Sequence, residues 1–385
     1  MTTYDVAVVG LGIVGASALR YFADQGIRAI GLEAFGPAHG YGSSHGESRI
    51  FRRAYWEGAT YLPLLDRAHA LWSELRERTR EPIIMETGGV FMGLEETGMV
   101  ARSRQTALAF DVPHEMLDAG QLRARFPAFR VEKGMIGIYE PGAYMILAER
   151  ARFAMLDLAV QGGAEARFGV RVTEMAPSGQ AITITVQTGE TFSCGAVVVA
   201  TGAWMANQLV EDVRPFIQPT QVPIYWFRAA SGHEAEHAAG RLPVFLHESP
   251  SGRMIYGCPS WGEHGVKVGF HNHQQVVRDP SILDRTVSGA LWGEMAGYLR
   301  EVLPALDPIP IKSHICYYTM SKDGNFIIDR SRLHSNVAYA SACSGHGFKF
   351  APAVGEAVAR LALGQELGHE PRVDLTPYRL LRFDE

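Results

Sequence analysis

The sequence predicts an α/β fold in which a domain built on a parallel sheet is interleaved with a second, mostly antiparallel β-sheet domain. Three observations lead to this prediction. The chain opens with a strand–turn–helix–strand unit over 4–33, and a continuously apolar run at 196–202 suits a central strand of the same sheet. Between 222 and 315 the pattern changes to short strands separated by turns, which is typical of an antiparallel sheet.

The opening unit carries a dinucleotide-binding fingerprint. An apolar strand over 4–9 leads into Gly10, Gly12 and Gly15, spaced as G-x-G-x-x-G, and then into a helix over 16–25. Glycines at these positions permit a tight turn, close approach of the backbone to a pyrophosphate, and close packing of helix on strand. The N-terminus of the helix offers backbone N–H groups and a positive dipole end to the phosphates.

The unit ends on Glu33, after a second strand over 28–32. An acid at this distance from the glycines accepts hydrogen bonds from ribose hydroxyls. An NAD-binding domain would continue with alternating strands and helices. Here 38–55 is rich in Gly, Ser, His and Arg and is predicted to be a loop leading into a helix. This interruption favours FAD over NAD as the bound dinucleotide.

The apolar run at 196–202 shows that the Rossmann-like sheet resumes after a long insertion. Further helices are predicted over 61–79, 148–161 and 351–363, with a hairpin of strands over 181–187 and 190–194 around Gly189. We expect an FAD-binding domain made of 1–85, 146–215 and 320–385, and a substrate domain made of 86–145 and 216–319.

Composition and charge exclude several classes of protein. The net charge of −5 gives no electrostatic footprint for nucleic acid or an anionic membrane. Apolar runs fall short of the roughly 20 residues of a membrane span, and Met1–Thr3 lead straight into the first strand, which leaves no room for a signal peptide. The four cysteines are scattered without a C-x-x-C pair, so we expect free thiols, no metal site and a cytoplasmic location.

Several segments, in the same order along the chain, resemble the family of monomeric sarcosine oxidase and N-methyltryptophan oxidase. The most specific of them are 42–52, 267–271, 316–319, 326–329 and 344–350, and the resemblance runs nearly from end to end. It implies FAD bound covalently to a cysteine, oxidation of a secondary amine, reoxidation by molecular oxygen, and a monomer.

Cys316 matches the cysteine that forms a thioether to the flavin in this family. The alternative is a small buried apolar residue, which describes most free cysteines. Cys194, Cys258 and Cys343 have no such context and are interpreted as structural.

The resemblance assigns catalytic roles to Lys267, His271, Arg49 and His346. Arg49 and His346 would lie beside the flavin. Lys267 would lie over it, where a fixed cation favours electron transfer to oxygen. The alternative for Lys267 is a solvent-facing position on a half-buried strand, and for each histidine a structural hydrogen-bonding role.

Arg52 and Lys349 would clamp the carboxylate of the substrate, Arg as a fork and Lys as a point charge. If this segment is helical, Arg49 and Arg52 lie one turn apart, and the alternative is a solvated basic face. Tyr256 and Tyr318 would face the substrate, whereas the pattern does not separate Trp226, Phe245 and Leu246 from the core.

The fingerprint and the resemblance together define the residues expected to contact FAD. They are Gly10, Gly12, Ile13, Val14, Gly15, Glu33, Ser43, Ser44, Arg49, Ile50, Val172, Thr201, Gly202, Cys316, Gly345, His346, Gly347, Phe348 and Lys349.

The expected reaction is oxidative demethylation of an N-methyl amino acid such as sarcosine or N-methyltryptophan. It would give formaldehyde, a primary amino acid and hydrogen peroxide. Ser44, Glu47, Arg53 and Trp56 depart from the commonest family pattern, which leaves the substrate open. The alternatives are a cyclic imino acid such as pipecolate, a dehydrogenase with another electron acceptor, and a non-catalytic nucleotide-binding protein.

Overall fold

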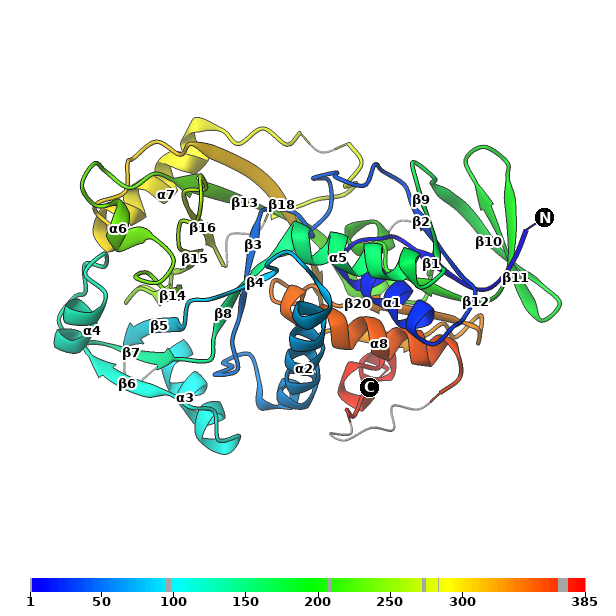
Figure 1. Cartoon of the computed structure of the whole chain (residues 1–385), viewed down its shortest axis with the longest axis horizontal. Helices are drawn as coiled ribbons and strands as arrows, with labels where there is room; N and C mark the ends of the chain where they lie inside the picture. The colour runs from blue at the N-terminus through cyan, green and yellow to red at the C-terminus, as the bar shows by residue number, and fades with distance from the viewer. Residues whose placement is uncertain are drawn as a thin grey trace.

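The computed structural model describes residues 2–94, 98–206, 209–271, 275–282, 284–365 and 373–384. The described strands form sheets of eight, nine and three strands. The eight-stranded and nine-stranded sheets lie toward opposite ends of the molecule, with the three-stranded sheet between them (Figure 1).

The eight-stranded sheet has a parallel centre in the order β9–β2–β1–β12–β20. These strands are β1 (Thr2–Val9), β2 (Ala29–Glu33), β9 (Glu165–Phe168), β12 (Thr191–Val199) and β20 (Val337–Ser341). Antiparallel strands extend it, namely β10 (Val172–Ser178), β11 (Ala181–Val186) and β19 (Ile327–Arg330). The chain moves from β1 to β2 on one side and later to β12 on the other, so β1 lies at the topological switch point where such sheets bind ligands.

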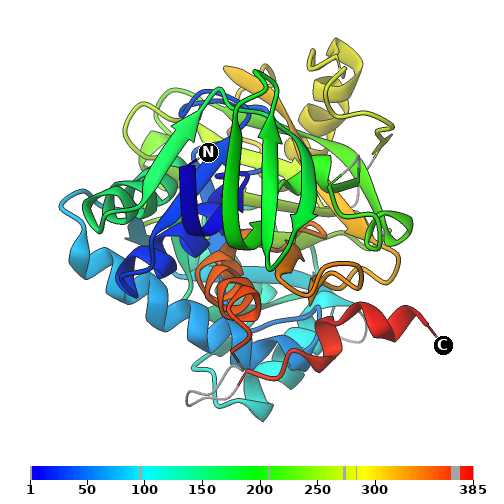
Figure 2. The same ribbon diagram turned by 90° about the vertical axis from the view of Figure 1, so that its right-hand side faces the viewer.

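The two faces of this sheet are buried against different layers. Val6 and Val8 pack in a cluster with helices, whereas Ala7 and Val9 pack with the β10–β11 hairpin, as the alternation of a strand requires. The helices on the first face are α1 (Ile13–Asp24), α2 (Leu62–Arg78), α5 (Ala148–Gln161) and α8 (Ala351–Ala362). Figure 2 shows the hairpin strands in front, with these helices to one side.

The nine-stranded sheet forms the second wall. Its strands are β5 (Gly89–Leu94), β6 (Glu115–Asp118), β7 (Met135–Glu140), β13 (Ile217–Phe227), β14 (Val244–Glu248), β15 (Met254–Cys258), β16 (Val266–Phe270), β17 (Gln275–Val276) and β18 (Lys312–Ser321). Its described strand pairs are antiparallel except β14 with β5. The prediction of a mostly antiparallel second sheet is therefore confirmed. The helices beside it are α3 (Met99–Ala109), α4 (Ala119–Arg125), α6 (Glu234–His237) and α7 (Gly289–Val302).

The three-stranded sheet corrects one prediction. It consists of β3 (Ser48–Phe51), β4 (Ile84–Glu86) and β8 (Tyr144–Leu147). The segment 38–55 was predicted to be a loop that leads into a helix. The helix follows as α2, but residues 48–51 form strand β3 because they pair with β8, a distant part of the chain. Arg49 and Arg52 are therefore not one helical turn apart.

A second correction concerns β12. The hairpin strand predicted over 190–194 and the apolar run at 196–202 form one continuous strand, Thr191–Val199. Its first half pairs with β11 and its second half with β20 along the same edge. The helix predicted over 148–161 is confirmed with these limits.

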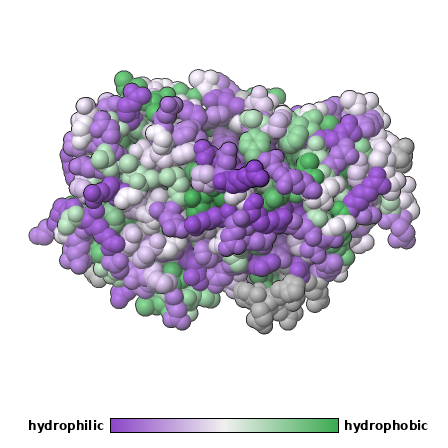
Figure 3. All heavy atoms as spheres, in the orientation of Figure 1, coloured by the Kyte–Doolittle hydropathy of each residue, from purple (hydrophilic) through white to green (hydrophobic). Residues whose placement is uncertain are grey.

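Short 3₁₀ turns complete the fold, and they include Ala59–Tyr61, Gly202–Ala206, Arg214–Phe216, Phe348–Phe350, Thr376–Tyr378 and Leu380–Phe383. No helix in the described part of the chain is long and apolar enough to cross a membrane. On the face shown in Figure 3, hydrophobic residues lie in small groups among hydrophilic ones.

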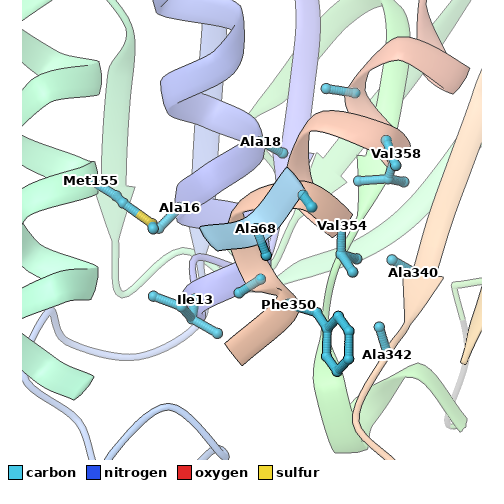
Figure 4. Close-up of a cluster of buried hydrophobic side chains, with 14 of the residues drawn as sticks. Ile13, Ala16, Ala18, Ala68, Met155, Ala340, Ala342, Phe350, Val354 and Val358 are labelled. Atoms are coloured by element: carbon cyan, nitrogen blue, oxygen red, sulfur yellow. The ribbon is translucent and has the colours of Figure 1, made fainter. Parts of the chain in front are cut away.

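Helix α1 is packed closely against its neighbours. Ala16 faces Met155 of α5, and Ala18 lies on the side of α8 (Figure 4). Gly15 is in contact with the glycine turn, since a Cβ atom added there would lie 1.8 Å from the carbonyl oxygen of Gly10. Because Gly15 has no side chain, the turn and the helix can pack this closely.

The variant Gly15→Ala should lose about 3 kcal/mol of unfolding free energy, because the added methyl group meets rigid backbone. The control is Gly293→Ala in α7, where nothing lies within 4 Å of the added Cβ. It should gain about 0.5–1 kcal/mol, because alanine has the higher helix propensity. Urea denaturation of both variants compares them. Equal stability of the two variants would contradict the packing argument.

Candidate functional site

A cavity of about 470 Å³ lies at the carboxyl ends of the parallel strands. Residues at or just beyond the ends of β1, β2, β12 and β20 line it, among them Gly10, Glu33, Thr201 and Ala342. Residues of the nine-stranded sheet, including Tyr256 and Cys316, line it from the other side. The two large sheets therefore enclose one cavity between them.

The glycine turn shapes one end of this cavity. Gly10 has φ of +90°, which favours glycine, and Gly12 precedes the first residue of α1 without a capping side chain. The hydroxyl of Ser44 accepts a hydrogen bond from the backbone N–H of Ile13 at 2.9 Å. Ser43 donates to the carbonyl of Tyr317 at 2.8 Å, so this loop joins the turn to β18.

Glu33 is held in place by backbone donors. Its carboxylate accepts hydrogen bonds from the N–H groups of Leu11 at 2.8 Å and Phe35 at 3.1 Å. Arg152, from α5, lines the same region and donates to the carbonyls of Leu11, at 3.1 Å, and Pro37. Arg152 was not identified from the sequence, because a lone arginine in an amphipathic helix carries no signal of its own.

Cys316 lies on β18 beside the Arg49 guanidinium. The distance from Arg49 Nη2 to Cys316 Sγ is 3.8 Å. Arg49 is fixed by hydrogen bonds to the carbonyls of Ser43, at 2.8 Å, and His45, at 2.7 Å. Cys343 also lines the cavity, and its sulfur and that of Cys316 each lie 3.8 Å from the Tyr317 carbonyl oxygen.

Arg52 follows β3 and is buried, with 3% of its surface exposed. Its Nη2 atom lies 2.6 Å from both carboxylate oxygens of Glu57. Burial is the largest single effect and disfavours a charged Glu57, but Arg52, together with smaller contributions from His346, Lys349 and His271, outweighs it and lowers the pKa of Glu57 to about 2. The sequence analysis missed Glu57, whose signal is its position five residues beyond Arg52.

Lys349 lies on the same side of the cavity as Arg52. Its Nζ donates to the carbonyl of His346 at 2.7 Å. Burial is the main reason that the pKa of Lys349 falls to about 7, and Arg52 lowers it further while Glu57 opposes the shift.

The two predicted histidines both line the cavity. Burial lowers the pKa of His271 to about 4 and that of His346 to about 3. Both imidazoles are therefore neutral near pH 7, so neither adds positive charge to the site.

Lys267 is buried on β16 and donates to the carbonyl of Ser48. The alternative that it points to solvent is therefore wrong. Burial, and next the charge of Arg49, lower the pKa of Lys267 to about 7. Lys267 does not itself line the cavity, and a Cβ atom added at Gly46 would lie 3.6 Å from its Nζ and 3.4 Å from Arg49 Nη1.

Tyr256 and Tyr318 each pack against a glycine of a neighbouring segment. Tyr256 is opposite Gly269 in the β15–β16 pair, and a Cβ atom at Gly269 would lie 2.6 Å from the Tyr256 hydroxyl. A Cβ atom at Gly345 would similarly lie 2.9 Å from the Tyr318 ring. Burial raises the pKa of both tyrosines, so they remain neutral hydrogen-bonding groups.

The structure brings nearly all of the predicted residues to this one cavity. Those that line it are Gly10, Gly12, Ile13, Val14, Glu33, Ser43, Ser44, Arg49, Ile50, Arg52, Val172, Thr201, Gly202, Tyr256, His271, Cys316, Tyr318, Gly345, His346, Gly347, Phe348 and Lys349. Gly15 and Lys267 lie behind the lining. Leu246 lines the cavity, whereas Phe245 and Trp226 belong to hydrophobic clusters.

The four departures from the family pattern lie in different places. Ser44 accepts from the N-terminus of α1, Glu47 pairs with Lys312 at 2.6 Å, and Arg53 pairs with Asp66 at 2.7 Å. Trp56 alone among the four stacks edge-on against His271, with ring centroids 5.6 Å apart. Trp56 is therefore the departure that contacts His271, whereas Ser44 is the one of the four that lines the cavity.

The residues present fit a dinucleotide such as FAD. Gly12, the N-cap residue of α1, contributes no capping side chain beside the cavity. The N-terminus of this helix therefore offers backbone N–H groups and its positive dipole end to the phosphates of a dinucleotide. The glycine turn and Glu33 would hold its pyrophosphate and ribose.

Within the described ranges, no group of three or more His, Cys, Asp or Glu side chains could hold a metal ion. Asn272 and His273, which follow His271 with a metal-like spacing, lie outside the described residues.

Carboxylate binding should weaken by about tenfold between pH 7 and pH 9, the value of one charge-assisted contact. Lys349 is protonated below its pKa of about 7 and loses its charge as the pH rises, whereas Glu57, His271 and His346 do not titrate in this range. Titration with methoxyacetate, which carries no amine, measures the effect. Lys349→Met should give weaker binding that changes less with pH, the remaining change being that of Lys267, whose pKa is also about 7. An unchanged slope would contradict the assignment.

Three comparisons with known proteins identify the family and the fold. Residues 5–361 match the DAO family, described as FAD dependent oxidoreductase. The chain is 38% identical to monomeric sarcosine oxidase from Streptomyces avermitilis, over 95% of both chains. It is 34% identical to N-methyl-L-tryptophan oxidase from Salmonella dublin, over 99% of this chain and all of the other.

Solved structures show the same fold at lower identity. NikD, an amino acid oxidase essential for nikkomycin biosynthesis, superposes with a TM-score of 0.85 at 23% identity and covers 98% of each chain. Glycine oxidase from Geobacillus kaustophilus gives a TM-score of 0.80 at 22% identity and covers 99% of each chain. The resemblance predicted from the sequence is confirmed, and the chain belongs to the DAO family of FAD dependent oxidoreductases.

Proposed function

We propose that this protein is an FAD-dependent oxidase that demethylates an N-methyl amino acid. The observation that carries the proposal is that Arg52 and Lys349 share one cavity with Cys316 and the dinucleotide turn. The pair of cations suits a carboxylate, and the relatives named for sarcosine and N-methyl-L-tryptophan oxidation support an N-methyl amino acid as the substrate class.

The overall reaction balances with one oxygen molecule and one water. An N-methyl amino acid, O₂ and H₂O give the primary amino acid, formaldehyde and H₂O₂. Bound FAD would accept the hydride equivalent from the N-methyl carbon and pass the electrons to oxygen. The imine that remains is then hydrolysed.

The polypeptide supplies orientation and charge. Arg52 and Lys349 would fix the carboxylate, which directs the amine toward Cys316 and the flavin end of the cavity. Arg52 is paired with Glu57 at 2.6 Å, so a substrate carboxylate would exchange with that of Glu57. His271 and His346 are neutral and add no charge, so the positive charge of Arg52 would favour loss of the proton from a cationic amine.

We propose that FAD is attached covalently through Cys316. Its sulfur lines the cavity 3.8 Å from the Arg49 guanidinium, where it would bond to a flavin ring methyl group. Forming the thioether removes two electrons and two protons, which oxygen accepts as hydrogen peroxide. Cys343 lines the same cavity, and burial raises the pKa of its thiol, which disfavours the nucleophilic thiolate at that position.

Acid precipitation separates bound from free pigment. The wild-type pellet should remain yellow, and Cys316→Ala should release essentially all of its pigment to the supernatant. Cys343→Ser is the matched control and should keep its pigment in the pellet. A colourless wild-type pellet, or loss of attachment in Cys343→Ser alone, would contradict attachment at Cys316.

Lys267 is proposed to promote reoxidation by oxygen. Its buried ammonium group adds positive charge behind Arg49, where reduction of oxygen creates negative charge. Lys267→Met should slow reoxidation by roughly a hundredfold, the scale of one electrostatic group in an active site. Lys312→Met is the control, since both ammonium groups lie near Trp226, at 5.9 Å for Lys267 and 4.8 Å for the exposed Lys312. Stopped-flow mixing with oxygen measures both, and an equal effect of the two variants would count against a specific role of Lys267.

A substrate screen tests the function directly. Sarcosine, N-methyl-L-tryptophan and pipecolate would each be assayed for peroxide release, with formaldehyde measured in parallel. Peroxide and formaldehyde in equal amounts support demethylation, whereas peroxide without formaldehyde from pipecolate supports the cyclic imino acid. Flavin that is reduced by an amine but reoxidised slowly by oxygen supports a dehydrogenase.

We further propose a cytoplasmic monomer in which FAD binds to 1–85, 146–215 and 320–385, while 86–145 and 216–319 form the substrate domain. Strands β5–β7 and β13–β17 fall within the second set of ranges, which supports two interleaved domains, whereas β4, β8 and β18 each cross one of these limits. Free cysteines support a reducing location.

A further inference from the structure

Arg52 and Lys349, here called the carboxylate clamp, are two like charges that are both buried. Arg52 is 3% exposed and Lys349 is 6% exposed. Glu57 pairs directly with Arg52, whereas the described hydrogen bond of Lys349 Nζ is to a neutral carbonyl, that of His346. Desolvated like charges repel more strongly than charges in water, so the clamp needs a further stabilising group when the substrate is absent.

The aromatic ring of Tyr55 lies near both cations. The Arg52 guanidinium carbon is 4.7 Å from its ring centroid, and Lys349 Nζ is 5.0 Å from the same centroid. Each cation also has a second ring, Phe91 for Arg52 at 5.5 Å and Phe350 for Lys349 at 5.2 Å. Tyr55 is the ring that the two cations share, and an aromatic face attracts cations most strongly where water is excluded.

The hydroxyl of Tyr55 fixes the orientation of this ring. It lies 2.6 Å from Nδ1 of His346, whose Nε2 lies 3.4 Å from the carbonyl oxygen of Gly324. Because His346 is neutral, a proton on Nε2 leaves Nδ1 to accept the hydrogen bond from Tyr55. Tyr55 is fully buried and stacks edge-on against Phe350 and Tyr61, so its ring is held on several sides.

We infer that Tyr55 is a positioning residue for substrate binding, because its ring holds Arg52 and Lys349 as one carboxylate-binding unit. This inference rests on the proposed function insofar as the clamp binds the substrate carboxylate. Tyr55 does not line the cavity and acts through the two cations.

The experiment measures the dissociation constant of methoxyacetate, an ether isostere of sarcosine that cannot be oxidised as an amine. Tyr55→Leu removes the ring and should weaken binding by about ten- to thirtyfold, as expected for desolvated cation–π contacts. Tyr55→Phe keeps the ring and should stay within about threefold of wild type. With a turned-over substrate, Tyr55→Leu should raise KM and leave kcat little changed, because the carboxylate is bound equally in the ground and transition states.

Tyr61→Leu is the matched packing control. Tyr61 is also fully buried, its ring centroid is 5.6 Å from that of Tyr55, and no cation among the described residues lies over it. Its methoxyacetate affinity should remain near that of wild type. Where the leucine variant of Tyr55 does not fold, pentafluorophenylalanine at position 55 keeps the ring shape and reverses its quadrupole, and it should weaken binding relative to Tyr55→Phe.

The measured affinities distinguish a failure of the role of Tyr55 from a failure of the proposed function. Equal weakening by Tyr55→Phe and Tyr55→Leu, or by Tyr61→Leu, would overturn the role of the Tyr55 ring, as would unchanged affinity in Tyr55→Leu. A wild type that binds no methoxyacetate would overturn the clamp and Tyr55 together. A wild type that binds methoxyacetate but oxidises no amine would refute the proposed function, and the affinities of the variants would still decide the role of Tyr55.

Discussion

Buried positive charge is the constraint on which this site depends. Arg49, Arg52 and Lys349 line one cavity, Lys267 lies behind it, and Glu57 forms an ion pair with Arg52. Burying charge without a partner costs on the order of several kcal/mol per ion, and the pKa values of about 7 for both lysines reflect that cost. A diphosphate at the dinucleotide turn and a carboxylate at the clamp would supply the missing negative charge, so the protein is electrostatically prepared for anionic occupants.

The arrangement of the sheets explains why these cations come from such distant parts of the chain. Arg49 belongs to β3, Lys267 to β16, and Lys349 to the 3₁₀ turn before α8. The parallel sheet would bind the dinucleotide at the carboxyl ends of its strands, and these ends face one side of the cavity. The insertions build the opposite wall, so the chain must leave and rejoin the parallel sheet to enclose the ligands from both sides.

Much of the fold could be predicted because its signals are local. The glycine turn with Glu33, the apolar strand before Gly202 and the helix over 148–161 each depend on neighbouring residues. The strand character of Arg49 could not be predicted in this way, because β3 exists only through its pairing with β8.

The site residues also divide into those with a local sequence signal and those that depend on distant contacts. Those within conspicuous motifs were found, whereas Glu57, Arg152 and Tyr55 carry no motif and acquire their roles from distant partners. Tyr55 meets His346 and Lys349 only after α8 has packed against α2 and the first sheet. Their contribution arises from tertiary contacts that periodicity and spacing do not encode.

The position of Cys316 has a mechanical consequence. Strand β18 pairs with β13 over ten consecutive residues, Lys312–Ser321 against Ile217–Trp226, so its sulfur is rigidly part of the nine-stranded sheet. The dinucleotide turn belongs to the other large sheet. Attachment at Cys316 would link the flavin end of the cofactor covalently to the nine-stranded sheet, while the other end is bound non-covalently by the eight-stranded sheet. Separating the two large sheets would then require the adenine end of the cofactor to dissociate from its binding site. Unfolding of the two sheets would therefore be cooperative.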